Sequence, residues 1–185
     1  MTTTPNLGLT LPDVGDGIAN GKPWGATLNA NFTKIDSACG SFVHVKSYGA
    51  VGDGITNDRQ AIQDAMNAAS LSGIPLLFDG LTYGIASTTT FALTVPSGGI
   101  KIIGCPGVSC FKLLSATVDT SIIGSSSSVG VVDIEGITFD GNKSVVSSVN
   151  TNGIKLTSGH TVYSRKNTYK NFKDLGSAVG GKGIY

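Results

Sequence analysis

The sequence predicts a mostly β protein of short strands and tight turns, preceded by one helical segment. Two features of the composition support this prediction: only 14 % of the residues are charged, and 26 of the 185 are glycine. Since 40 % of the residues are hydrophobic, the chain has enough apolar material to fold rather than stay disordered. Many valines and isoleucines between glycine, serine and threonine favour short strands that end in turns.

Charge and targeting signals exclude several functions. The 13 basic and 12 acidic residues give a net charge of +1, so we expect no nucleic-acid partner. The segment Met1–Pro5 lacks the basic and apolar regions of a secretory signal. No apolar run approaches the ~20 residues that a membrane helix needs, so we expect no membrane insertion. The three cysteines form no metal-binding pattern, and we expect reduced, buried thiols at Cys105 and Cys110, no metal site and no cofactor.

The first segment, residues 1–41, contains a predicted helix. Pro23 suits the first helical turn and Gly40 suits the stop. Between them an apolar stripe follows spacings of 4, 4, 3 and 4: Trp24, Leu28, Phe32, Ile35 and Cys39. A helix of ~15 residues is marginal alone, so this stripe needs a partner. Self-association and packing onto the next domain of the same chain both satisfy that need.

The second segment alternates strands with one more helix. Residues 42–46 are predicted to form a strand and residues 48–54 a glycine-rich loop. Asn57 is the predicted helix cap, with Gln60 in the reciprocal capping position, and Gly73 the predicted stop. The packing face of this helix is expected to be Ala61, Ile62, Ala65, Met66 and Ala69. Short strands follow at 76–78 and 81–85.

The remainder of the chain shows short strands and a weak repeat. Apolar runs lie at 91–95, 100–103, 111–114, 122–123, 129–132, 134–139 and 153–156. Residues 132–139 resemble residues 162–169, a shift of 30, and each stretch runs into a turn that contains asparagine. Solenoid coils repeat every 20 to 50 residues or so, and one coil fits this echo. A β-sandwich can give the same strand spacing.

The stretch Val45–Ala69, which contains Tyr-Gly-Ala-Val-Gly-Asp-Gly, resembles the entry segment of the pectate-lyase-like superfamily. The Leu77–Tyr83 and Ile134–Asn142 stretches are similar to later parts of that family. The resemblance implies a right-handed, single-stranded parallel β-helix over residues 42–185, whose open end is capped by the helix. It places these residues in the cap: Tyr48, Gly49, Asp53, Asp58, Ile62 and Met66. A cap is physically reasonable, because an open solenoid end exposes apolar edges.

Two stretches of the first segment, Pro5–Pro12 and Trp24–Asp36, resemble the leader of phage tail fibres and tailspikes. The resemblance implies that residues 1–41 anchor a spike to a phage tail, baseplate or adaptor protein. It also implies a homotrimer in the virion that binds, and in many relatives degrades, bacterial surface polysaccharide. We expect four residues of the helix to serve attachment and oligomerisation: Trp24, Leu28, Phe32 and Ile35.

Polysaccharide cleavage uses paired carboxylates, and the best local pair is Asp133 and Glu135, which share one face of a predicted strand. Acidic side chains on strands are also ordinary surface, so catalysis by this segment stays open. The chain stops at Tyr185 in mid-coil, and we therefore expect a longer natural protein. A non-enzymatic tail protein is the main alternative. A free secreted enzyme fits less well, because the sequence has no signal peptide.

Overall fold

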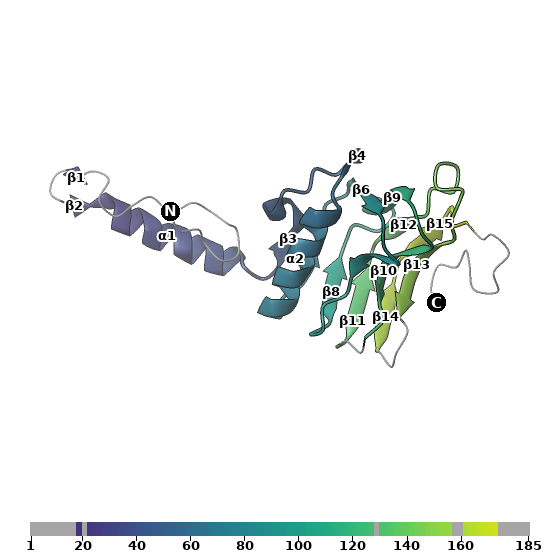
Figure 1. Cartoon of the computed structure of the whole chain (residues 1–185). Coiled ribbons are helices and arrows are strands. Elements are labelled where there is room, and N and C mark those ends of the chain that lie inside the picture. Colours follow the sequence, from purple (N-terminus) through teal and green to yellow (C-terminus); the bar gives the residue numbers. More distant parts are fainter. Residues whose placement is uncertain (1–17, 20–21, 128–129, 157–160, 174–185) are drawn as a thin grey trace.

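The computed structural model describes residues 18–19, 22–127, 130–156 and 161–173 (Figure 1). The first elements are β1 (Ile18–Ala19), β2 (Lys22–Pro23), α1 (Trp24–Cys39), β3 (Val43–His44), the 3-10 helix η1 (Val45–Tyr48), β4 (Asp53–Asn57) and α2 (Arg59–Ser72). Then follow β5 (Leu76–Leu77), β6 (Thr82–Ser87), β7 (Phe91–Thr94), β8 (Ile100–Ile103), β9 (Cys110–Ala116), β10 (Thr120–Ser125), β11 (Val132–Glu135), β12 (Thr138–Asp140), β13 (Thr151–Leu156), β14 (Val162–Arg165) and β15 (Thr168–Lys170).

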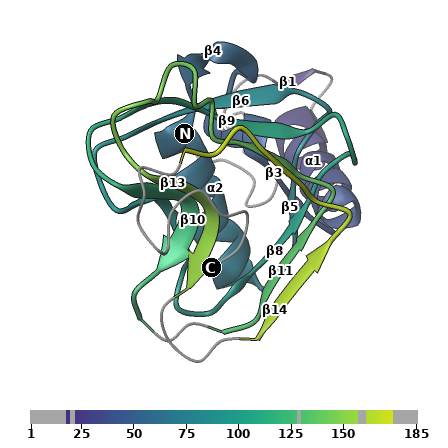
Figure 2. The same cartoon turned by 90° about the vertical axis from the view of Figure 1, so that its right-hand side faces the viewer.

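Three parallel sheets wind around one core. Their strand orders are β3-β5-β8-β11-β14, β4-β6-β9-β12-β15 and β7-β10-β13. From β5 to β13, each turn of the chain adds one strand to each sheet in succession, as in β8, β9 and β10, so the strands form the rungs of a solenoid (Figure 2). This confirms the predicted parallel β-helix and excludes the β-sandwich. Within the described residues, only the small β1–β2 pair in front of α1 is antiparallel.

The repeat found in the sequence is the register between two rungs. Val132 pairs with Val162 in β11 and β14, and Thr138 pairs with Thr168 in β12 and β15, each a shift of 30 residues. Stacked rungs bring equivalent side chains into contact, so similar residue types recur at the coil length. The echo therefore arises from direct pairing between neighbouring strands.

Aromatic rings form a column inside the solenoid. Tyr83, Phe111, Phe139 and Tyr169 are register partners on successive strands of one sheet. The Phe111 and Phe139 rings meet edge to face with their centroids 5.7 Å apart, and the Phe139 and Tyr169 rings stack with their centroids 5.1 Å apart. Burial of each phenylalanine contributes roughly 1.5–3 kcal/mol, so this column is a major part of the core.

Helix α2 covers the first-rung end of the solenoid (Figure 1). Ile62, Ala65, Met66 and Ala69 are buried on its inner face, as the apolar spacing predicted. Two alanines among the four let the helix approach the strands closely. The helix ends at Gly73, whose φ of +67° is left-handed and whose N–H donates to the carbonyls of the last turn.

The capping arrangement of α2 differs from the prediction. The Asn57 side chain accepts from the N–H of Arg59 at 3.2 Å, but the same oxygen accepts from Ala86 at 3.0 Å. Gln60 donates to Asp64 at 2.9 Å instead of reaching back to the cap, because an acidic partner lies one turn ahead on the same face. The predicted reciprocal capping pair is therefore wrong, and Asn57 instead ties the helix start to β6.

Three further predictions need correction. The strand predicted at 42–46 contains only two strand residues, because the chain turns into η1 at Val45. The run 134–139 is two strands, β11 and β12, which are separated by Gly136 with a φ of +75°. A left-handed residue cannot continue a strand, so the chain turns a corner there. Cys110 is buried, as predicted, but Cys105 is exposed because it opens the loop between β8 and β9.

Candidate functional site

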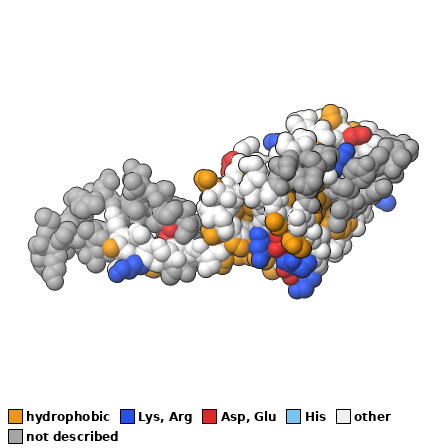
Figure 3. All heavy atoms as spheres, turned by 90° about the horizontal axis from the view of Figure 1, so that it is seen from below, with side chains coloured by type: hydrophobic (Ala, Val, Ile, Leu, Met, Phe, Trp, Pro, Cys, Tyr) orange, Lys and Arg blue, Asp and Glu red, His pale blue; other side chains and the backbone are white. Residues whose placement is uncertain are grey.

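The two carboxylates predicted as a catalytic pair lie on the outer face of the sheet β3-β5-β8-β11-β14. On β11, Val132 and Ile134 are buried in the core, while Asp133 and Glu135 alternate with them and point outward. Figure 3 views the molecule from below and shows basic and acidic side chains gathered beside hydrophobic ones. The structure thus places both residues on one face, at positions with charged neighbours.

A ladder of ion pairs runs across the rungs on this face. Arg165 Nη2 lies 2.9 Å from both oxygens of Asp133, and Arg165 Nε lies 3.5 Å from Glu135. Lys166 donates to Glu135 at 2.9 Å. Lys101 Nζ lies 3.9 Å from Asp133, which exceeds hydrogen-bond distance. Asp133 thus stands between basic side chains of the two neighbouring rungs, whereas both basic partners of Glu135, Arg165 and Lys166, lie on the following rung.

The ladder determines what these carboxylates can do. The hydrogen bond from Lys166, followed by the charges of Lys166 and Arg165, holds the pKa of Glu135 below its usual value. Conversely, the bond to Asp133 raises the pKa of Arg165. A general acid must carry a proton near neutral pH, which a carboxyl with a lowered pKa does not. Glu135 is therefore held as the anion of an ion pair near neutral pH and is poorly suited to act as a general acid.

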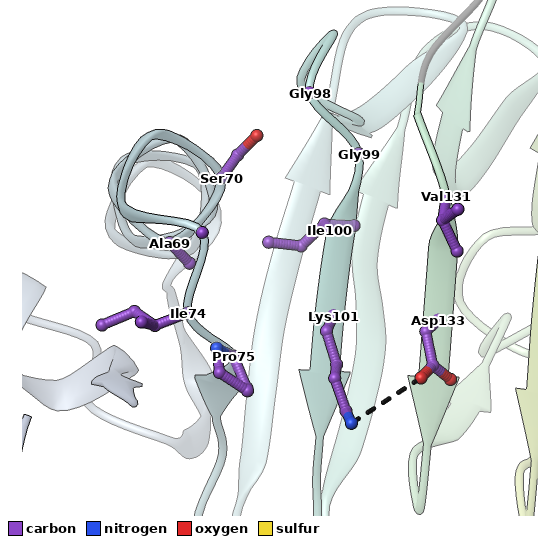
Figure 4. Close-up of a pocket in the computed structure, with 11 residues that line it drawn as sticks. Ala69, Ser70, Ile74, Pro75, Gly98, Gly99, Ile100, Lys101, Val131 and Asp133 are labelled. Carbon is purple, nitrogen blue, oxygen red and sulfur yellow. Dashed lines mark ion pairs between the residues drawn. The ribbon is translucent and has the colours of Figure 1, made fainter. Parts of the chain in front are cut away.

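A groove of about 270 Å³ opens next to the ladder. One wall is the last turn of α2 with the loop into β5, and the other is formed by the starts of β8 and β11 (Figure 4). Polar lining comes from Ser70, Lys101 and Asp133, and apolar lining from Ile74 and Val131 among others. Sequence reasoning did not find this groove, because it joins two turns that are far apart in the chain.

The residues assigned to the cap lie around the loop before α2. Asp58 is buried and accepts from the N–H groups of Val51 at 2.7 Å and Gly52 at 3.0 Å. Asp53 is exposed, and its carboxylate accepts from Thr56 N at 2.7 Å and Ile55 N at 2.9 Å. These backbone bonds, led by Thr56, lower the pKa of Asp53. Both aspartates hold the glycine-rich loop in shape.

The other assigned cap residues have structural positions. Ile62 and Met66 are fully buried in α2, whereas Tyr48 is partly buried and closes η1. Gly49 adopts a φ of +90°, which ends η1 and turns the chain towards the loop. Burial raises the pKa of the Tyr48 phenol above its usual value. These residues position the loop and the helix rather than forming a pocket.

The residues assigned to attachment lie in or before α1. Figure 1 shows α1 projecting beyond α2, away from the strands. Leu28 and Phe32 are partly buried, and Ile35 is 49 % exposed. The side chains of Trp24 and Cys39, and the whole stretch Pro5–Pro12, lie outside the described residues.

No group of three or more His, Cys, Asp or Glu side chains within the described ranges is placed to hold a metal ion. None of the helices in the described part of the chain is long and apolar enough to cross a membrane.

Sequence comparison shows no family for this chain. No protein-family model matches the chain. Over 41 residues the chain is 61 % identical to the plasmin and fibronectin-binding protein A of Streptococcus pneumoniae. That stretch is 21 % of this chain and 6 % of the other protein, so it carries no information about the whole.

Structural comparison identifies the fold. The mannuronan C-5 epimerase A-modules AlgE6 and AlgE4 of Azotobacter vinelandii superpose with TM-scores of 0.61 and 0.62, at 22 % and 21 % identity, over 70 % and 71 % of this chain. ORF18 of Geobacillus virus E2 superposes with a TM-score of 0.54 at 24 % identity over 70 %. The chain spans 38 %, 38 % and 26 % of these proteins. The chain has the parallel β-helix fold that its sequence resemblance implied.

Proposed function

We propose that this chain is the N-terminal part of a phage tailspike, in which residues 1–41 attach the spike to the virion. The observation that carries the proposal is the layout of the chain. A helix with a half-exposed apolar side chain, Ile35, stands in front of a capped parallel β-helix. The likeness to a fold found in a Geobacillus virus protein supports this assignment, as does the leader resemblance of Pro5–Pro12.

The partners of this spike are part of the proposal. The anchoring segment binds a tail, baseplate or adaptor protein, and a homotrimer covers the apolar stripe of α1, because an unpaired stripe is costly in water. The β-helix of the longer protein binds bacterial surface polysaccharide. Two neighbours of the same fold are named as epimerases of mannuronan, which is a polysaccharide, and this supports the ligand class.

The proposal has two forms. In one the longer spike degrades its polysaccharide ligand, and in the other it only binds it. In this segment the carboxylates at 133 and 135 are held by basic partners, which favours a non-catalytic role for them. Any depolymerase activity then belongs to other rungs. A non-enzymatic tail protein is the second candidate, and the same ion pairs favour it.

The proposal is tested with the full-length protein and the surface polysaccharide of its host. We expect binding of the intact polysaccharide in solution, measured by calorimetry, and a trimeric mass by light scattering. A decrease in polysaccharide chain length during incubation selects the depolymerase form. A monomer that binds no surface polysaccharide contradicts both forms.

A further inference from the structure

The groove beside α2 contains a basic side chain that is not fully used by its neighbours. Lys101 Nζ lies 3.9 Å from the Asp133 carboxylate, and the described residues offer it no hydrogen bond. Asp133, in contrast, is bound by Arg165, whose Nη2 lies 2.9 Å from both oxygens. Lys101 is therefore held only by a long ion pair and presents its ammonium donors to the groove, next to a carboxylate that Arg165 contacts more closely.

The groove has a second polar group, the Ser70 hydroxyl, and apolar side walls. Ser70 projects from the last turn of α2, and Figure 4 shows its hydroxyl at the upper end of the groove and Lys101 at the lower end. Between them lie Ile74 and Pro75 on one side and Val131, which is 50 % exposed, on the other. Polar groups at the two ends, with apolar side walls between them, suit a ligand that carries hydroxyls on a ring of C–H groups.

The size of the groove limits the ligand. At about 270 Å³ it is slightly smaller than the roughly 300–1,000 Å³ of pockets for drug-sized molecules. It is therefore suited to one or two sugar residues.

The outer face of the sheet continues the groove along the solenoid axis. Lys101, Asp133 and Tyr163 are register partners on β8, β11 and β14, so they stand in one row at the strand spacing of about 4.8 Å. Tyr163 is 50 % exposed and offers an aromatic face with a hydroxyl at its edge. A chain that leaves the groove in this direction passes over the row.

We propose that this groove binds a sugar residue of the glycan, with Lys101 as the main polar contact and Tyr163 as the next contact along the chain. The inference rests on the proposed function, since it names where the spike holds its polysaccharide. It assigns this role to the sheet that carries the ion-pair ladder, at the helix-capped end of the solenoid.

The test uses the full-length protein with amide NMR and a panel of defined tetrasaccharides: neutral, uronate-containing and amino-sugar-containing. We expect at least one of them, at millimolar concentration, to shift the amide signals of Gly98, Gly99, Lys101 and Val131. Lys101→Met keeps the aliphatic stem and removes the donors, so it should weaken this binding about tenfold or more. The control is Lys166→Met, which removes an exposed lysine on the same face but outside the groove and should leave binding unchanged.

Three outcomes decide the inference. Shifts in the groove that Lys101→Met abolishes and Lys166→Met preserves support it. If host polysaccharide binds equally to the native protein and to Lys101→Met, and the groove amides do not move, the inference is overturned while the proposed function stands. If no host polysaccharide and no tetrasaccharide binds at all, both fall together.

Discussion

Asp58 provides the sharpest test of how the cap is held. Its carboxylate is buried at 2 % exposure and accepts two backbone N–H groups of the glycine-rich loop, from Val51 at 2.7 Å and Gly52 at 3.0 Å. Asp53, four residues from Gly49, makes a similar pair of bonds to Thr56 and Ile55, but in an exposed position. Asp53 also accepts from the Thr56 hydroxyl at 2.8 Å, so it makes one more bond than Asp58 but in water, which makes it a control for burial.

The magnitude follows from the burial. A hydrogen bond to a charged group contributes about 1.5–3 kcal/mol, and a buried donor that loses its partner keeps its desolvation cost. We expect Asp58→Ala to lower the free energy of unfolding by about 3 kcal/mol. Asp53→Ala should lower it by less than about 1 kcal/mol, because water replaces the lost carboxylate. For a chain of this length, about 3 kcal/mol corresponds to a decrease in Tm of roughly 6–12 °C.

Thermal unfolding followed by circular dichroism measures the difference between the two variants. Amide hydrogen exchange adds a local readout, since the amides of Val51 and Gly52 should lose protection in Asp58→Ala only. Equal decreases in Tm for the two variants would refute the reasoning, because burial would then play no part. Unchanged protection at Val51 and Gly52 would show that the carboxylate does not hold the loop.

Three further predictions concern the rungs, the core and the ladder. Gly136→Ala should be strongly destabilising, because its Cβ would lie 2.4 Å from the carbonyl oxygen of Gly104 on the neighbouring rung. Gly107→Ala has a similar φ of +78° but no atom within 4 Å of the added Cβ, so it should cost only backbone strain, and urea unfolding of the two variants measures the difference. Burial raises the pKa of Tyr83 to about 12, so the contribution of this phenol to stability is complete below the ordinary phenol pKa of about 10 and is lost as the pH rises towards 12. Phenolate absorbance and circular dichroism should therefore change together, and ionisation of Tyr83 without unfolding would contradict this. Glu135→Gln in the full-length protein should leave any depolymerase rate within about twofold, and a loss of two orders of magnitude in kcat would make it catalytic after all.

The solenoid was predicted from the resemblance of Val45–Ala69 to a known family, because the repeat in the sequence fitted a solenoid but left a β-sandwich open. Stacked rungs put residues of the same type in contact, so the echo between 132–139 and 162–169 carried the register itself. The amphipathic spacing of α2 and its stop at Gly73 are likewise local signals, and both were found. The corner at Gly136 was missed, because a glycine inside an apolar run does not reveal its φ without the neighbouring rung.

The candidate site was much less visible in the sequence. That Asp133 and Glu135 share a face followed from alternation along a strand, but their partner Arg165 lies one full rung away. The pairing changes these residues from a carboxylate pair into an ion-pair ladder. The groove at Lys101 was even harder to predict, because its walls come from a helix end and from two different rungs. Such sites depend on register, which single-strand patterns do not contain.

The anchoring role of residues 1–41 is the central claim, and one assembly measurement addresses it. Full-length spike with and without residues 1–41 is mixed with spike-less particles, and the number of spikes bound per particle is counted by electron microscopy. We expect the deleted protein to remain a folded β-helix that binds surface polysaccharide but no longer joins the particles. Equal incorporation of the two proteins would contradict the attachment role.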